Sequence, residues 1–336
     1  MVGYYADATL YNFQIDASVP PSGRGLRTFE QAFLHYDINH YRNIVTEGYT
    51  KNNVAFFPLF PLLASVLHGL GIGAVMSLFL VSWTFCFIAA TVLYKWLSYE
   101  IKLRRAKLSP WQLLALIALF PTSFFLAIAY NESLFITLTV GSLYAYRRGN
   151  YWIASVLIIL SCATRVQGGA LAIFFVADYF LSRQRDHKKL IPVLLAPIGL
   201  LAYMWYLHLQ FGNPFEFITA QHNWGRLSGN YIQNILSSIR PPYLWYIPVL
   251  LLGIWAVYKK LGLPWLAYII VFFAIPLSSG RLDSLNRYML ACPVLFLGLT
   301  LWLKDQPKAW QILYLSSSIF LLAWNILLFF NDYWVA

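Results

Sequence analysis

The amino-acid sequence predicts an all-α polytopic membrane protein, and its composition, its apolar runs and the placement of its basic residues support this fold class. Of the 336 residues, 60% are hydrophobic and 11% are charged, whereas a soluble domain carries roughly 25% charged residues. Aromatic residues make up 18%, as is typical where their rings line two membrane interfaces. This composition excludes a soluble enzyme, a disordered chain and a disulfide scaffold. We therefore expect residues 1–336 to form a single integral membrane domain.

The apolar runs predict a bundle of about ten transmembrane helices over residues 73–330, after an outer region at 1–72. A spanning helix needs about 20 mainly apolar residues, and fewer where it packs inside a bundle. A long outer loop is expected at 210–242. The candidate spans are 73–97, 111–129, 133–147, 151–166, 168–182, 190–209, 243–258, 263–278, 287–303 and 309–330.

Basic residues recur in every second connection, and this alternation predicts the orientation. Lys and Arg concentrate in cytoplasmic loops, so we expect these five connections to face the cytoplasm. On this topology the cytoplasmic side holds 15 basic and four acidic residues, while the outer side holds nine of each. The net charge of +11 therefore follows from topology and does not indicate nucleic acid. The basic clusters are Lys102/Arg104/Arg105/Lys107, Arg147/Arg148, Arg183/Arg185/Lys188/Lys189, Lys259/Lys260 and Lys304/Lys308.

The segment 56–71 is apolar enough to cross the membrane, but a crossing would move the basic loop at 102–107 to the outside. We therefore expect a re-entrant or interfacial segment, which suits its proline and glycine residues. A real crossing, with the following span broken, is the alternative.

The first candidate site is Asp37, which stands with His40 and Tyr41 just before this apolar segment. An Asp at the membrane boundary can act as the general base for a lipid-borne hydroxyl. Alternatively, Asp37 caps a helix that starts near Ile38. Together with His35 and His40 it could also bind a metal ion, although such spacing is common by chance.

Three further charged residues lie between spans on the same side. Glu132 follows Asn131 in a tight turn, where it is either a carboxylate held at the mouth of the bundle or the start of the next helix. Arg165 and Arg287 lie at the ends of spans, where an ionisable residue suggests function and a guanidinium fork suits a phosphate. For Arg165 a structural pair with Glu132 or Asp37 is the competing interpretation.

Other parts of the sequence mainly exclude functions. There is no Gly-rich phosphate loop after a strand, and the three cysteines lie far apart in apolar runs without a CxxC pair. A nucleotide-binding domain, a zinc or redox site and nucleic-acid binding are therefore not expected. The loop 210–242 resembles a lid or an acceptor-recognition surface, and it carries Glu216, His222, Trp224, Arg226 and Arg240.

Carboxylates and arginines gathered at the outer mouth, without nucleotide-binding machinery, suit the transfer of a sugar from a lipid phosphate. The phosphate is already a good leaving group, so one carboxylate base and a cation for the growing phosphate charge are enough. A single displacement of this kind inverts the anomeric centre, unlike retaining hydrolysis with its second carboxylate.

At this point the motifs, in their order and over nearly the whole chain, resemble a known family. The sequence is similar to the PIG-V type of GPI mannosyltransferases and their bacterial relatives, multi-spanning glycosyltransferases of the GT-C class. The motifs that carry the resemblance are Tyr36-Asp37, His40-Tyr41 and Gly48-Tyr49 followed by AFFPLFPLL, then FPTSFFLAIAYNESLF, ATRVQG, Arg287-Tyr288 and Tyr333-Trp334-Val335.

The resemblance implies a polyprenyl- or dolichyl-phosphate mannose donor used on the non-cytoplasmic side, with Asp37 as the essential carboxylate. It supports Arg165 and Arg287 as ligands of the donor phosphate. No cofactor is expected, and a divalent metal is left open. Residues expected to bind the sugar or acceptor are His40, Tyr41, Asn131, Glu132, Gln167 and Tyr288.

Two features depart from the family pattern: Tyr36 stands where the family commonly has Trp, and no helix precedes the first outer loop. We expect a hexose, with mannose favoured, to move to a lipid-linked or glycan acceptor. The expected location is a bacterial plasma membrane, or the endoplasmic reticulum membrane in a eukaryote. The rival interpretations are a transporter or scramblase of lipid-linked sugars and a non-catalytic subunit of a glycosylation complex whose partner supplies the missing helix.

Overall fold

The computed structural model describes residues 33–34, 36–182, 185–224, 226, 229–239, 241, 243–331 and 333–335, and these residues form helices and loops without a β-strand. The longer helices are α3 (Asp37–Glu47), α4 (Leu59–Gly69), α5 (Ala74–Leu103), α6 (Pro110–Ala118), α7 (Glu132–Arg147), α8 (Tyr151–Cys162), α9 (Ala170–Leu181), α11 (Pro197–Phe211), α14 (Tyr243–Leu261), α15 (Leu263–Leu277), α17 (Pro293–Leu303) and α18 (Lys308–Phe330). The shorter elements are α10 (Ile191–Leu195), α12 (Glu216–Thr219), α13 (Tyr231–Ser237), α16 (Leu285–Leu290) and the 3-10 turns η1 (Ser123–Leu126), η2 (Val166–Gly169), η3 (His187–Leu190) and η4 (Ala220–Trp224).

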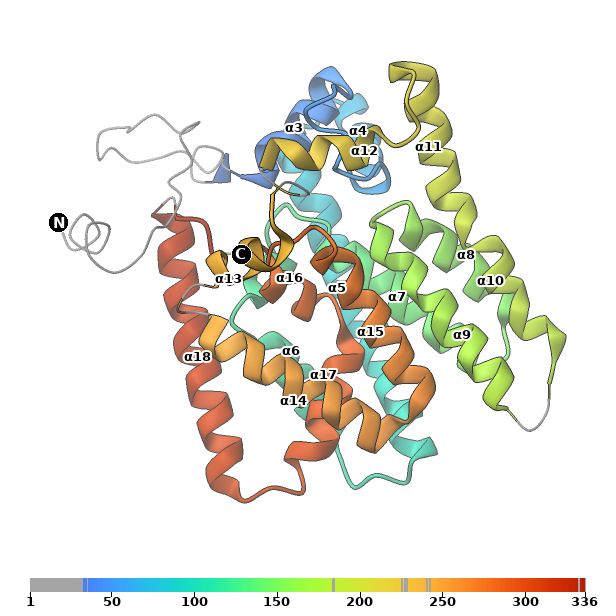
Figure 1. The fold of residues 1–336 in the computed structure, drawn as a ribbon, viewed down its shortest axis with the longest axis vertical. Coiled ribbons are helices and arrows are strands. Elements are labelled where there is room, and N and C mark those ends of the chain that lie inside the picture. The colour runs from blue at the N-terminus through green and yellow to red at the C-terminus, as the bar shows by residue number, and fades with distance from the viewer. Residues whose placement is uncertain are drawn as a thin grey trace.

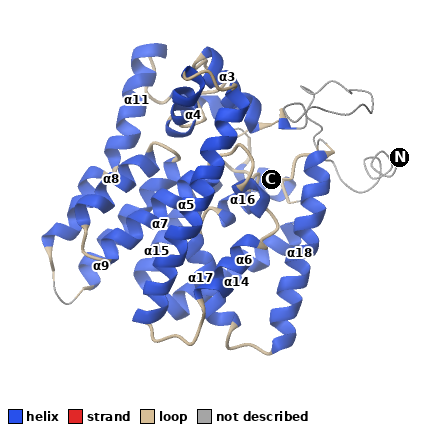
Figure 2. Ribbon diagram, turned by 180° about the vertical axis from the view of Figure 1, so that it is seen from behind, coloured by secondary structure: helices blue, strands red, loops and turns tan. Residues whose placement is uncertain are grey.

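The long helices form one bundle with α5, α7 and α15 near its middle (Figure 1). Both views place α8, α9 and α11 along one edge and α18 along the opposite edge (Figure 2). The pairs α5 with α7, α7 with α8, α14 with α17 and α9 with α15 make the most extensive contacts. The short helices α3, α12, α13 and α16 gather at one end of this bundle, which we call the site end.

Four helical segments are long and apolar enough to cross a membrane: Ala74–Leu103, His187–Phe211, Tyr243–Leu261 and Lys308–Phe330. Many large apolar side chains on the bundle are exposed, as lipid-facing side chains are. The described residues thus form an all-helical membrane protein, while ten crossings stay a prediction. The segment predicted as re-entrant or interfacial contains the short apolar helix α4.

The predicted span 111–129 is wrong as a continuous helix, because α6 ends at Ala118. Pro121 lacks a backbone N–H and cannot continue the helical hydrogen bonds. Neighbouring side chains bond the carbonyl groups that the break leaves free: Ser318 Oγ donates to Leu119 O at 2.9 Å and Asn325 Nδ2 to Pro121 O at 3.0 Å. Polar side chains from α18 therefore stabilise irregular backbone inside the bundle.

The predicted span 287–303 is also divided, into α16 and α17, with a break at Ala291 and Cys292 before Pro293. A hydrogen bond joins the first break to α16, since Thr122 Oγ1 donates to Asn286 O at 3.2 Å. The predicted loop 210–242 likewise contains structure, namely α12, η4 and α13. Its residues 225, 227, 228, Arg240 and 242 lie outside the described part of the chain.

The basic connections gather at the end of the bundle opposite the site end (Figure 1). There Glu100, which is fully buried, forms ion pairs with Arg104 and with Arg147, whose Nε lies 3.0 Å from Glu100 Oε1. Asp178 pairs with Lys189 at 2.9 Å. Separation of the basic loops from the site end agrees with the alternation that the sequence predicted.

The packing of α8 against α11 supplies a test of the fold. A Cβ on Gly199 would overlap the carbonyl oxygen of Ile159, and it would lie 3.0 Å from Ala163 N. Because backbone atoms cannot move aside, Gly199→Ala should destabilise the protein by about 1–3 kcal/mol and lower the midpoint of thermal unfolding in detergent. The control is Gly69→Ala, whose Cβ meets nothing within 4 Å. Equal unfolding midpoints for the two variants would contradict the described contact.

Candidate functional site

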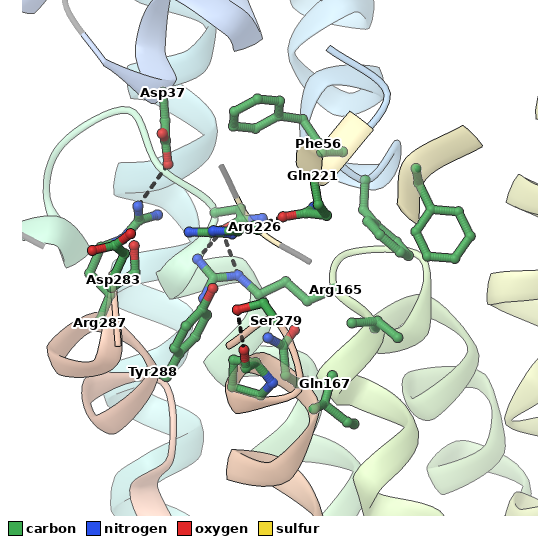
Figure 3. A pocket seen from close by; sticks show the side chains of 18 of the residues that line it. Asp37, Phe56, Arg165, Gln167, Gln221, Arg226, Ser279, Asp283, Arg287 and Tyr288 are labelled. Atoms are coloured by element: carbon green, nitrogen blue, oxygen red, sulfur yellow. Dashed lines mark hydrogen bonds and ion pairs between the residues drawn. The ribbon is translucent and has the colours of Figure 1, made fainter. Parts of the chain in front are cut away.

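A cavity of about 900 Å³ opens at the site end, where segments from the whole length of the chain converge (Figure 3). Charged, polar and aromatic side chains all contribute to its wall. Its lining consists of Tyr36, Asp37, His40, Tyr41, Ala55, Phe56, Phe57, Asn131, Thr164, Arg165, Val166, Gln167, Phe217, Ile218, Gln221, Asn223, Arg226, Ile275, Pro276, Ser278, Ser279, Arg281, Asp283, Ser284, Arg287, Tyr288 and Trp334.

Beside the cavity, Glu132 at the start of α7 is fully buried and pairs with two arginines. Its Oε1 lies 2.6 Å from Arg165 Nη2 and 2.7 Å from Arg287 Nη2. Arg287 Nε also donates to the same oxygen at 2.8 Å. The helix begins at Glu132, as one interpretation of this turn predicted, and its buried carboxylate lies between the two guanidinium groups.

Asp37 is the first residue of α3, and its Oδ2 lies 2.7 Å from Arg287 Nη1. The capping interpretation is wrong, because Tyr36 is the N-cap residue of α3 and no side chain caps the helix. The Asp37 side chain keeps 21% of its surface exposed, against 7% for Arg287 and none for Glu132. Of the two carboxylates bound to Arg287, Asp37 is therefore the one that is accessible from the cavity.

Arg165 occupies the extended residue before η2, between α8 and α9. Its Nε donates to Asn131 Oδ1 at 2.8 Å, and its ion pair with Glu132 is the structural pair that the sequence offered as one alternative. The guanidinium also borders the cavity. Both a structural and a ligand-binding role for Arg165 are thus compatible with its position.

The Arg287 guanidinium is fixed by aromatic rings as well as by carboxylates. Its Cζ lies 4.5 Å from the Tyr130 ring centroid, 5.0 Å from that of Phe125 and 5.9 Å from that of Trp334. Such cation–π contacts stabilise a cation by about 0.5–2 kcal/mol each. Asn286 Nδ2 donates to Val335 O at 2.6 Å. This bond holds the segment that contains Trp334 against α16, the helix that carries Arg287.

The remaining predicted residues line the cavity too. The His40 ring stacks on Phe56 with centroids 4.7 Å apart, and Asn131, Gln167 and Tyr288 form other parts of the wall. Burial raises the pKa of the Tyr41 hydroxyl well above its ordinary value. Tyr41 therefore stays protonated at neutral pH and can act as a hydrogen-bond donor rather than a base.

The structure thus brings the nine predicted site residues together: eight line the cavity, and Glu132 lies behind two of them. Sequence reasoning missed the aromatic rings of Phe56, Phe57 and Phe217 and the amide of Gln221. Phe56 and Phe57 lie in the AFFPLFPLL motif that follows Gly48-Tyr49, which was the available signal. Gln221 lies in a short 3-10 turn without periodicity, so nothing marked it.

The metal hypothesis has no support from the described residues, where no group of three His, Cys, Asp or Glu side chains comes together. His35, one of its three proposed ligands, lies outside the described part of the chain. Metal dependence therefore stays a question for assay.

Comparison with known proteins gives a consistent result. A family model described as Mannosyltransferase (PIG-V) matches residues 25–331. The chain is 26% identical over 289 residues to human "GPI alpha-1,6-mannosyltransferase 2", a match that covers 78% of this chain and 55% of the relative. The mouse protein of the same name is 25% identical over 285 residues, covering 77% and 55%. The chain thus spans about half the length of the curated relatives it matches. No solved structure matches it.

The network centred on Glu132 can be tested directly. We predict that Glu132→Gln lowers the free energy of unfolding by about 3–5 kcal/mol, because it leaves two buried arginines without their shared charge. Chemical or thermal unfolding in detergent measures this. Glu47→Gln, at the exposed end of α3, is the control and should change stability by less than about 0.5 kcal/mol. Similar stabilities for the two variants would show that the buried pairs do not form.

Proposed function

Because the chain belongs to the Mannosyltransferase (PIG-V) family, we propose that it transfers mannose from a polyprenyl- or dolichyl-phosphate donor to a lipid-linked or glycan acceptor. One observation carries the proposal: the accessible carboxylate of Asp37 lies in a large cavity, 2.7 Å from a guanidinium that is itself anchored on a buried carboxylate. A base and a cation in contact are what a displacement at a sugar phosphate requires.

In the proposed reaction Asp37 accepts the proton of the acceptor hydroxyl. The acceptor oxygen forms a bond with the anomeric carbon while the bond from that carbon to the phosphate oxygen breaks. The bonding electrons leave with the phosphate, which changes from a singly charged diester to a more negative monoester. The configuration at the anomeric carbon is inverted, because there is one displacement.

The ion pair between Asp37 and Arg287 couples the loss of negative charge at Asp37 to the gain of negative charge at the departing phosphate. When Asp37 takes up the proton, it loses its negative charge, and Arg287 loses one of its two carboxylate partners. At the same stage the departing phosphate gains negative charge. Arg287 can therefore exchange Asp37 for the phosphate as its ion-pair partner. Its buried charge remains paired throughout this exchange.

Other residues of the wall have binding roles in this proposal. Arg165 borders the cavity beside Asn131 and gives the phosphate a second guanidinium. His40, Tyr41, Gln167 and Tyr288 supply polar groups for sugar hydroxyls. A cavity of about 900 Å³ has room for a donor head group together with an acceptor sugar, since drug-sized ligands occupy pockets of about 300–1,000 Å³.

The proposed placement puts the site end on the non-cytoplasmic face and the basic end in the cytoplasm. It is supported by the basic loops that gather at the opposite end (Figure 1) and by the preference of Lys and Arg for cytoplasmic loops. On this placement α4, with Leu62 and Val66 exposed and the exposed Leu70 directly after it, is an interfacial helix at the level of the cavity.

The proposed activity is tested with purified protein in detergent or liposomes, offering polyprenyl-phosphate mannose, polyprenyl-phosphate glucose and a range of lipid-linked acceptors, with and without a chelator. We expect mannose to be consumed and to appear on an acceptor. Movement of the intact donor between leaflets without consumption would instead support the transporter interpretation. Activity only after a partner is added would support the subunit interpretation.

Substitution of the proposed base gives the sharpest test of mechanism. Asp37→Asn should reduce the rate of mannose transfer by about 100-fold or more, because general-base catalysis contributes about 10²–10⁴-fold. Folding should change little, since Arg287 keeps its pair with Glu132. The control is Glu47→Gln, which removes a carboxylate from the other end of the same helix. Transfer retained by a folded Asp37→Asn variant would end the assignment of Asp37.

A further inference from the structure

The four arginines on the cavity wall differ in how their charge is balanced. Three of them have a carboxylate partner in the structure. The fourth, Arg226, has no carboxylate within ion-pair distance among the described residues. The paired arginines are Arg165 with Glu132, Arg287 with Asp37 and Glu132, and Arg281 with Asp283, whose Oδ2 lies 2.6 Å from Arg281 Nε.

Arg226 is oriented without being neutralised. Its Nη1 donates to Gln221 Oε1 at 2.9 Å, and its backbone N–H donates to Gln221 O at 3.3 Å. Gln221 is uncharged, so these bonds fix the direction of the side chain and leave its positive charge in place. Figure 3 shows Arg226 and Gln221 directed into the cavity that Asp37 and Arg165 also face.

The Arg226 Nε is buried and has no hydrogen-bond partner among the described residues. A buried donor without a partner costs about 1–3 kcal/mol, and the cost is removed when a ligand supplies an acceptor. The Nε without a partner and the charge without a described carboxylate both belong to Arg226, a residue that lines the cavity. Both features are satisfied by an anion with oxygen acceptors.

We propose that Arg226 binds the phosphate of the lipid-linked donor, an assignment that rests on the proposed function. A phosphodiester carries one negative charge, and among the described residues Arg226 is the arginine of the wall without a carboxylate to balance it. Guanidinium groups bind phosphate oxygens through two parallel hydrogen bonds, and Arg226 Nε and its neighbouring Nη2 present such a pair. The segment around Arg226 therefore serves the donor, where the sequence suggested a lid or a surface for the acceptor.

This assignment separates two tasks among the arginines. Arg226 holds the charge that the phosphate carries before reaction, when Arg165 and Arg287 are still occupied by Glu132 and Asp37. Arg287 becomes available for the second charge only when Asp37 is protonated. Loss of Arg226 should therefore weaken donor binding more than it slows the displacement itself.

The experiment uses the full chain with Arg226→Gln, Arg226→Lys and the control Arg42→Gln. Arg42 is a cation of α3 that bonds Asn43 and does not line the cavity. Mannose transfer is measured against donor concentration. In parallel, equilibrium binding is measured for a short-chain polyprenyl phosphate and for the uncharged polyprenol of the same length. Thermal unfolding confirms that each variant is folded.

We expect Arg226→Gln to raise the donor KM and to weaken binding of the polyprenyl phosphate about 10- to 100-fold, the range for hydrogen bonds to a charged group. Its kcat should change little, and binding of the polyprenol should not change. Arg226→Lys should recover part of the affinity, because it restores the charge without the fork. Arg42→Gln should match the wild type.

The proposal is overturned if Arg226→Gln binds polyprenyl phosphate as Arg42→Gln does, or if it lowers kcat with an unchanged donor KM. Failure of the wild type to bind polyprenyl phosphate overturns it as well. Failure of the proposed function is seen separately, as a wild type that transfers no mannose from any donor. If phosphate binding still depends on Arg226 in that case, the role of Arg226 stands and only the reaction must be reassigned.

Discussion

The arrangement of the site depends on one buried carboxylate, Glu132, whose Oε1 accepts from two guanidinium groups. Arg165 directly precedes η2 and Arg287 lies in α16, so a single oxygen joins segments that are 33 and 155 residues from it. Buried ion pairs seldom raise stability above that of a packed apolar core, because desolvation offsets the attraction. What the pairs supply here is geometry: Glu132 Oε1 contacts Nε and Nη2 of Arg287, and the third nitrogen, Nη1, contacts Asp37.

The breaks between α6 and η1 and between α16 and α17 contribute to this arrangement of charged groups. Backbone that leaves helical form at membrane depth is tolerated where protein buries it or where it lines a cavity. The breaks at Pro121 and Pro293 satisfy that condition, since side chains from α18 bond the freed carbonyls near Pro121. The bond from Thr122 to Asn286 then joins one break to the short helix that carries Arg287. The proline positions are therefore part of how the site is assembled.

Sequence reasoning predicted the helical membrane fold and every residue of the central network, because charges are conspicuous in a chain that is 11% charged. It could not predict that Asp37 meets Arg287, 250 residues away, since such pairing follows from how helices pack and not from any local pattern. The end of α6 at Ala118 was missed because the apolar run continues through the break. Gln221 was missed because its role is to orient Arg226, a relation that spacing alone does not reveal.

The two carboxylates around Arg287 differ in what proton uptake would cost. Protonation of Glu132 would remove the partner shared by two buried arginines, so two cations would lose their compensation at once. Protonation of Asp37 removes one of two partners from Arg287 alone, and the Asp37 side chain is partly exposed to the cavity. In the proposed mechanism, the two acids of this network therefore have separate tasks. Glu132 holds the two arginines in position, and Asp37, which is accessible from the cavity, is the proposed base.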